Sequence, residues 1–403
     1  MNAIKNRFRL KDKLGLFTIA LAILWSPLTV WYLHIDAAAR TPLAFFVLSL
    51  LLFYKDFQKY AWKMPIKLYV FVAFYMLING LVKGSAAAYE RDGLYLMCTN
   101  ILEPVLTMMI TIILARKNFN RTVRILSIVL LLYCFICLLN AGYDESERLN
   151  VGLNANEIAI HCAICIGLLL LQFSQSRRTK SWLFVIISLF PLYVILKTES
   201  RMALTMVIIE VLFIWLSRID LKNPKHIIGS VIAAIMIVLI GSYILNNTMI
   251  GERMMSTSEQ GSELIFATGT FLDKFGDRGW PYYYSWPYFL QNPITGIGFH
   301  RWILYSPAEL VFHSEYLVQY VECGLLSFIP YMVFLFWLLK LISKKVKTST
   351  VPMDKTMSME LLGLLLAIFF SNFVLWSYDT HAVFIVYGLI FSYSKYVKRT
   401  KLS

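Results

Sequence analysis

The chain has 403 residues, of which 58% are hydrophobic and only 15% are charged, and its mean hydropathy is +0.63. Soluble domains carry about 25% charged residues, and an ordinary core cannot hide this much apolar surface. The composition excludes a cytosolic globular enzyme, a disordered protein and a nucleic-acid-binding protein, and it indicates an integral membrane protein. The net charge of +14 must therefore be judged by where the basic residues lie.

Apolar runs long enough to cross a bilayer recur along the sequence. They predict an all-α, polytopic fold with about twelve transmembrane helices in a single membrane domain, residues 1–403. The expected spans are 14–33, 37–54, 66–82, 93–115, 125–143, 155–174, 181–196, 201–217, 226–246, 314–340, 359–376 and 380–394. The first span is long enough to cross and has no convincing cleavage site after it, so we expect no cleavable signal peptide.

Lysine and arginine are distributed unevenly between the two sides that these spans define. Most of them lie on the side of Met1, and ten lie on the other side. Those ten are Arg40, Lys83, Arg91, Arg148, Lys197, Arg201, Arg253, Lys274, Arg278 and Arg301. The positive-inside rule then predicts that both termini are cytoplasmic. The net positive charge would face anionic lipid of the inner leaflet, with no need for nucleic acid as a partner.

Two pairs of cysteines, Cys134 with Cys137 and Cys162 with Cys165, have a spacing that also occurs in zinc and redox motifs. On a helix this spacing only places two side chains on one face. A matching histidine or cysteine pair in a loop is missing. We interpret the cysteines as packing residues and expect no metal site.

The longest segment between spans, 247–313, is expected outside the membrane and is expected to carry part of the active site. It contains a cluster of aromatic rings that could stack on sugars or form an interfacial belt. The rings belong to Trp280, Tyr282, Tyr283, Tyr284, Trp286, Tyr288 and Trp302. Ser306, Pro307 and Glu309 match a capping box. This pattern predicts a helix that starts there and carries His313 about two turns in, either as a structural residue or as part of a site.

Ionisable side chains inside a bilayer are costly and are therefore candidate functional groups. The clear examples within the expected spans are Glu103, Glu157, Glu210 and Glu322, with His161. For each carboxyl the alternative is an interfacial or neutralised group.

Three arginines, Arg201, Arg278 and Arg301, lie on the expected outer side, where basic residues are scarce. An anionic ligand would explain them, because the guanidinium group donates two parallel hydrogen bonds to phosphate. For Arg201, at the start of a span, the alternative is snorkelling towards the lipid headgroups.

Four short motifs follow one another between about residues 150 and 335. They are Gly152-x-Asn154-x-Asn156-Glu-Ile-Ala159, Ser200-Arg201-Met-Ala203, Arg278 followed by Asn292-Pro-Ile-Thr-Gly-Ile-Gly298, and His313-Ser-Glu-Tyr-Leu317 followed by Glu322-Cys-Gly324. Together they resemble the motifs of the O-antigen ligase and polymerase family. The resemblance implies a bacterial inner-membrane glycosyltransferase with the all-helical architecture called the C-type fold. Such enzymes take a saccharide from undecaprenyl pyrophosphate in the periplasm and need no metal and no nucleotide cofactor.

The resemblance also implies roles for individual residues. The two pyrophosphate-binding arginines would be Arg201 and Arg278, and the essential histidine would be His313. Arg301 and Asp379 are further candidates for substrate binding, and His381 lies beside the latter. Direct displacement at the anomeric carbon would make the enzyme inverting.

Two roles within the family stay open, together with one outside it. A repeat-unit polymerase, which the motif wording favours, joins lipid-linked saccharides, whereas a ligase transfers the polymer to lipid A-core. The partners would then be the lipid-linked donor, one of these acceptors, membrane lipid and a chain-length regulator. A flippase for lipid-linked oligosaccharides is the third reading, but it would need charged residues lining a path through the bilayer.

Overall fold

The computed structural model describes residues 8–33, 43–84, 93–140, 142–143, 149–150, 154–175, 178–218, 243, 269, 279–306 and 311–397. Of the features expected from the sequence, most of the span 226–246 and much of the segment 247–313 lie outside these residues.

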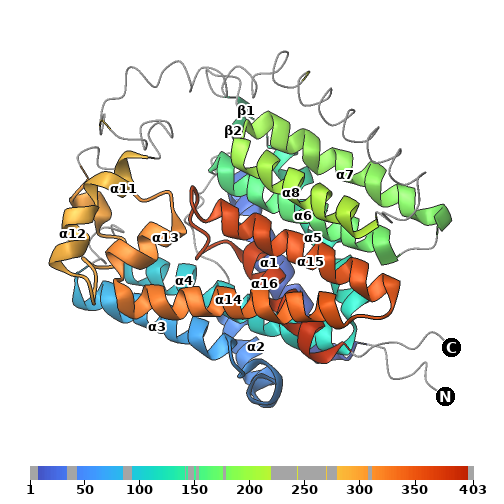
Figure 1. The fold of residues 1–403 in the computed structure, drawn as a ribbon, viewed down its shortest axis with the longest axis horizontal. Coiled ribbons are helices and arrows are strands. Elements are labelled where there is room, and N and C mark those ends of the chain that lie inside the picture. Colours follow the sequence, from blue (N-terminus) through green and yellow to red (C-terminus); the bar gives the residue numbers. More distant parts are fainter. Residues whose placement is uncertain are drawn as a thin grey trace.

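The described chain is almost entirely helical, which confirms the expected all-α class (Figure 1). The α-helices are α1 (Leu10–Leu33), α2 (Leu43–Asp56), α3 (Ile66–Val82), α4 (Gly93–Lys117), α5 (Phe119–Leu139), α6 (Ala155–Gln175), α7 (Arg178–Thr198), α8 (Arg201–Arg218), α11 (Trp280–Tyr284), α12 (Trp286–Gln291), α13 (Glu315–Leu317), α14 (Leu325–Thr348), α15 (Pro352–Ser371) and α16 (His381–Tyr396). Shorter turns are η2 (Phe57–Ala61), η6 (Trp302–Leu304) and η7 (Val318–Glu322). Strands β1 (Gly142–Tyr143) and β2 (Leu149–Asn150) pair antiparallel.

Helix length and hydropathy are those of a multi-pass membrane protein. Five segments of the described chain are long and apolar enough to cross a membrane. They are Leu10–Thr29, Met97–Lys117, Phe119–Leu139, Ala155–Ser174 and Leu325–Thr348. Shorter apolar helices, Ile66–Val82 and Trp182–Thr198, accompany them. Twelve crossings and a cytoplasmic location of both termini stay predictions.

Basic side chains gather where several helices end together. Lys117, in the last turn of α4, pairs with buried Asp12 in the first turn of α1. Lys11 pairs with Asp56 at the end of α2 at 2.5 Å. Lys345, near the end of α14, donates to the carbonyl oxygen of Val397 just beyond α16, at 2.8 Å. We call this the basic end of the bundle; its cations belong to segments expected on the inner side.

The opposite end of α14 and α16 is where the chain departs from regular helix. Figure 1 shows α11, α12 and α13 gathered there, at the left of the view. The expected span 314–340 is interrupted: after α13 and η7, Gly324 has a φ of 69° and α14 starts anew at Leu325. A Cβ at Gly324 would lie 2.5 Å from the amide nitrogen of Gly296, so only glycine fits without a shift. We call this the loop end of the bundle.

The interruption has a cause in the segment that follows α12. The amides of Ile297 and Gly298 donate to the carbonyl oxygens of Val321 and Glu322, at 3.1 and 2.8 Å. Because these carbonyl oxygens already accept hydrogen bonds from another segment, the helix need not continue past them to satisfy them. The amide of Leu325 in turn donates to the Pro293 carbonyl oxygen at 2.9 Å, which satisfies one of the open donors at the start of α14.

Candidate functional site

His313 lies in non-helical chain just before α13. The expectation of a helix that begins at Pro307 and carries this histidine is wrong, because residues 311–314 are not helical. The cap of the observed helix is Ser314, whose side-chain oxygen accepts from the amide of Leu317 at 3.4 Å. Residues 307–310 lie outside the described part of the chain. The histidine therefore projects from the loop end rather than from a helix face.

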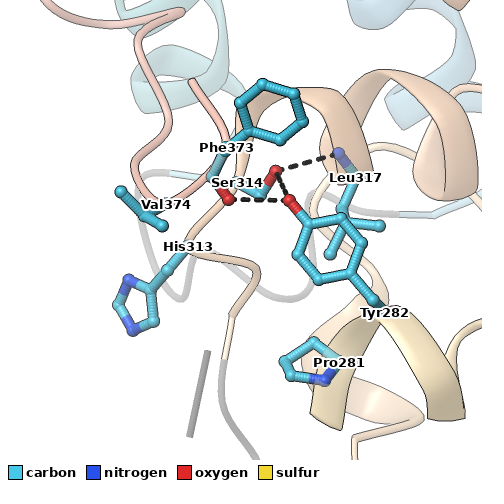
Figure 2. Close-up of a pocket in the computed structure, with 7 residues that line it drawn as sticks. All are labelled: Pro281, Tyr282, His313, Ser314, Leu317, Phe373 and Val374. Carbon is cyan, nitrogen blue, oxygen red and sulfur yellow. Dashed lines mark hydrogen bonds between the residues drawn. The ribbon is translucent and has the colours of Figure 1, made fainter. Parts of the chain in front are cut away.

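A pocket at the loop end is lined by His313, as Figure 2 shows. Its other lining residues are Pro281, Tyr282, Ser314, Leu317, Phe373 and Val374. The Tyr282 hydroxyl donates to the carbonyl oxygen of Phe373 at 2.7 Å and lies 2.9 Å from the Ser314 hydroxyl. These hydrogen bonds join three segments beside the imidazole that are far apart in sequence. They are α11, the residues before α13, and the connection after α15.

The connection between α15 and α16, which we call the 372–380 loop, supplies the surface on which His313 rests. The Trp376 ring stacks on the imidazole with 5.2 Å between centroids and 8° between planes. The amides of Asn372 to Leu375 donate to carbonyl oxygens of the last turn of α15, whereas those of Ser377 and Tyr378 find their acceptor outside the loop.

The holding group is the carboxylate of Glu315, which is fully buried. It accepts hydrogen bonds from the amides of Ser377 and Tyr378 at 2.8 and 3.0 Å, and from the Gln319 side chain at 2.9 Å. The backbone amide of the same glutamate donates to the Asn372 carbonyl oxygen at 3.0 Å. The residue two places after His313 therefore fixes the loop that carries the stacking tryptophan.

Replacing Glu315 with alanine should destabilise the loop end strongly. Two buried amides and one side-chain amide would lose their acceptor, and each unsatisfied group costs about 1–3 kcal/mol. We expect a large fall in the thermal midpoint of the purified protein in detergent. Glu315→Gln keeps an acceptor oxygen and should lose much less. Equal midpoints for Glu315→Ala and the wild type would refute the anchoring role.

Asp379, near the end of the same loop, is the second titratable group at the loop end. Desolvation, followed by the charges of Glu157 and Glu315, raises the pKa of Asp379 to about 8. Hydrogen bonding by the Asp379 backbone, and then by the Trp376 side chain, favours the carboxylate and moderates this rise in pKa. Burial therefore favours the protonated form of Asp379, which can donate a hydrogen bond.

Arg201 lies at the start of α8, beside the first turn of α6. It is the first residue of α8, and the preceding Ser200 donates to the side-chain oxygen of Asn156 at 3.2 Å. The neighbour of that asparagine is Glu157, whose charge acts on Asp379. The hydrogen bond thus places the start of α8 against the first turn of α6, and the relation of that turn to Asp379 is electrostatic, through Glu157. Arg278, its expected partner in binding pyrophosphate, lies outside the described residues.

The backbone on both sides of Arg301 is held by hydrogen bonds to one carboxylate. The carboxylate of Glu322 accepts from the amides of His300 and Trp302, both at 2.9 Å, so the residue between them is fixed. The Arg301 guanidinium lies over the Tyr305 ring at 5.6 Å. Its Nε is buried and has no hydrogen-bond partner among the described residues. Glu322, expected as an intramembrane carboxyl, is thus a loop anchor, and the arginine keeps donor capacity.

The remaining candidates from the sequence pack inside the bundle. His161 stacks on Tyr133 at 4.5 Å, and its Nδ1 lies 2.9 Å from the Glu157 carbonyl oxygen. Glu103 and Glu210 are buried. Cys134 and Cys162 face each other across α5 and α6 with sulfurs 3.3 Å apart, and the cysteines are free thiols.

No model of a known protein family matches the chain, and a search of curated proteins returns no match. What supports a function is therefore the loop end itself and the motifs that lie in it.

Proposed function

We propose that this chain is a membrane glycosyltransferase that moves a saccharide from undecaprenyl pyrophosphate to a sugar hydroxyl on the periplasmic face, as a repeat-unit polymerase for O-antigen or capsule. One observation carries the proposal. His313 lines a pocket at the end of a helical bundle opposite the basic end, and its imidazole rests on a loop anchored by buried hydrogen bonds. A positioned imidazole at a membrane boundary suits proton transfer to or from a lipid-linked substrate.

The proposed reaction is a single displacement. The acceptor hydroxyl attacks the anomeric carbon of the donor, and its proton passes to the neutral imidazole of His313. The bond between that carbon and the pyrophosphate oxygen breaks, and the diphosphate leaves with the electron pair. Arg201 and Arg278 stabilise the charge that develops on the leaving group, which is usually the largest catalytic contribution. The configuration at the anomeric carbon inverts.

Two further side chains fit this reaction. Arg301 is held in a fixed place with an unused donor at its Nε, and a diphosphate oxygen or a sugar carboxylate would satisfy it. Asp379 has a pKa raised to about 8. A protonated carboxyl beside an anionic donor adds no repulsion and can donate to a sugar oxygen.

The experiment that tests the proposed function is deletion of the gene, followed by analysis of the surface polysaccharide and of the lipid-linked pool. Lipid A-core that carries a single repeat unit would support the polymerase. Full-length polymer stranded on the lipid carrier would overturn it in favour of a ligase. Loss of lipid-linked donor from the periplasmic face would overturn it in favour of a flippase.

A further inference from the structure

The short helices α11 and α12 expose an apolar face. Trp280 and Phe289 are buried against the bundle, whereas Tyr283, Trp286 and Leu290 are 48%, 50% and 58% exposed. The exposed positions follow at intervals of three and four residues, so they form one side of the helical run. A contiguous apolar face on a helix marks a surface that a membrane or another protein covers.

The lack of charged residues in this segment also indicates that the exposed face of α11 and α12 is not in contact with water. Residues 279–299 contain no aspartate, glutamate, lysine or arginine. A surface helix in water normally carries charged side chains opposite its buried stripe. Here tryptophan and tyrosine take that place, and these residues are enriched where a membrane meets water.

The apolar face of α11 and α12 lies beside the start of α14. Ile294, just after α12, is 60% exposed and accepts a hydrogen bond at its carbonyl oxygen from the amide of Leu326 at 3.1 Å. Leu326 and Ile329, in the first turns of α14, are also exposed. Since α14 is one of the segments able to cross a membrane, its exposed apolar side faces lipid. The apolar face of α11 and α12 is next to that side.

We infer that α11 and α12 lie in the membrane interface of the leaflet at the loop end, with lipid acyl chains covering Trp286, Leu290 and Ile294. Helices of this kind bury their apolar face about 5–10 Å into the boundary between headgroups and acyl chains. The aromatic ring of Tyr283 is amphipathic and suits the headgroup level.

This placement has a consequence for the pocket of His313. Tyr282 lies on α11, next to the exposed face, and its hydroxyl is bonded to the 372–380 loop. The bilayer therefore holds one wall of the pocket at the depth of the lipid phosphates. The inference does not rest on the proposed glycosyl transfer, because burial, charge and the position beside α14 carry it whatever the pocket binds.

Spin labelling of the full chain in lipid bilayers tests the inference. Cys98, the one native cysteine that is not buried, is first replaced in Cys98→Ser. A nitroxide is attached at Leu290→Cys, and its collision rates with oxygen, which concentrates in lipid, and with a water-soluble nickel chelate are measured. Phe336→Cys, exposed on α14, is the lipid reference, and Thr350→Cys, exposed beyond its end, is the water reference. Trp286→Cys provides a second position.

We expect an oxygen-to-nickel collision ratio at position 290 close to that of Phe336→Cys and several-fold above that of Thr350→Cys. A ratio at both 290 and 286 equal to the water reference would overturn the inference. Shielding of both labels from oxygen and nickel alike would also overturn it, because another protein surface would then cover the face.

Discussion

Replacing His313 with alanine should abolish glycosyl transfer while the lipid-linked donor still binds. The imidazole is the proton acceptor of the proposed displacement, and a positioned general base contributes about 10²–10⁴-fold to rate. The ring contacts Trp376 and the pocket but carries none of the hydrogen bonds through which Glu315 anchors the 372–380 loop. Turnover of a lipid-linked donor by purified protein measures the loss.

A second variant separates chemistry from folding. His313→Asn keeps a polar side chain but removes the basic ring nitrogen, and it should be as inactive as His313→Ala. Both proteins should reach the membrane in normal amounts and bind donor as the wild type does. Full activity of either variant at normal abundance would contradict the role of the imidazole.

Replacing Arg201 with alanine should weaken donor binding and slow transfer. The guanidinium fork is proposed to hold the diphosphate, and loss of one such donor typically costs about 10²–10³-fold in rate. Arg201→Lys keeps the charge but loses the paired hydrogen bonds, so we expect an intermediate value. Arg278→Ala should resemble Arg201→Ala. Binding of a lipid-linked donor to purified protein measures the change.

The control for this prediction is Lys197→Ala. Lys197 is a basic residue in the last turn of α7, also on the expected outer side, and no role in donor binding is proposed for it. It should change donor affinity little. Wild-type affinity in Arg201→Ala, or an equal loss in Lys197→Ala, would contradict a specific contact with the diphosphate and leave only general attraction by positive charge.

The helices of the bundle could be predicted from the sequence because each follows from an uninterrupted apolar run. The expected spans 66–82 and 201–217 coincide with α3 and α8 to within one residue. The break at Gly324 could not be predicted in the same way. Its cause is a set of hydrogen bonds from the segment after α12, about thirty residues earlier. Hydropathy does not reveal such hydrogen bonds between distant segments. The expected helix through His313 is absent because residues 311–314 are not helical, and the described helix begins after the Ser314 cap.

The candidate site was predictable residue by residue but not as an arrangement. His313 stands out in the sequence through the motif that it begins, and Arg301 because basic residues are scarce on the expected outer side. A serine followed by Glu315 is a pattern typical of a helix start. It does not predict that the Glu315 carboxylate binds the 372–380 loop, because its partners there are some sixty residues away. The stacking role of Trp376 and the bridge made by Tyr282 depend on the same tertiary contact. The sequence analysis therefore singled out His313 and Arg301 but missed Glu315 and Trp376, and packing determines which groups meet.

The most direct test of the central claim is an assay with purified protein, a synthetic polyprenyl diphosphate saccharide and a saccharide acceptor, with products identified by mass spectrometry and NMR. The account predicts release of polyprenyl diphosphate together with a new glycosidic bond of inverted configuration, both absent in His313→Ala. A product of retained configuration, or release that persists in His313→Ala, would contradict it.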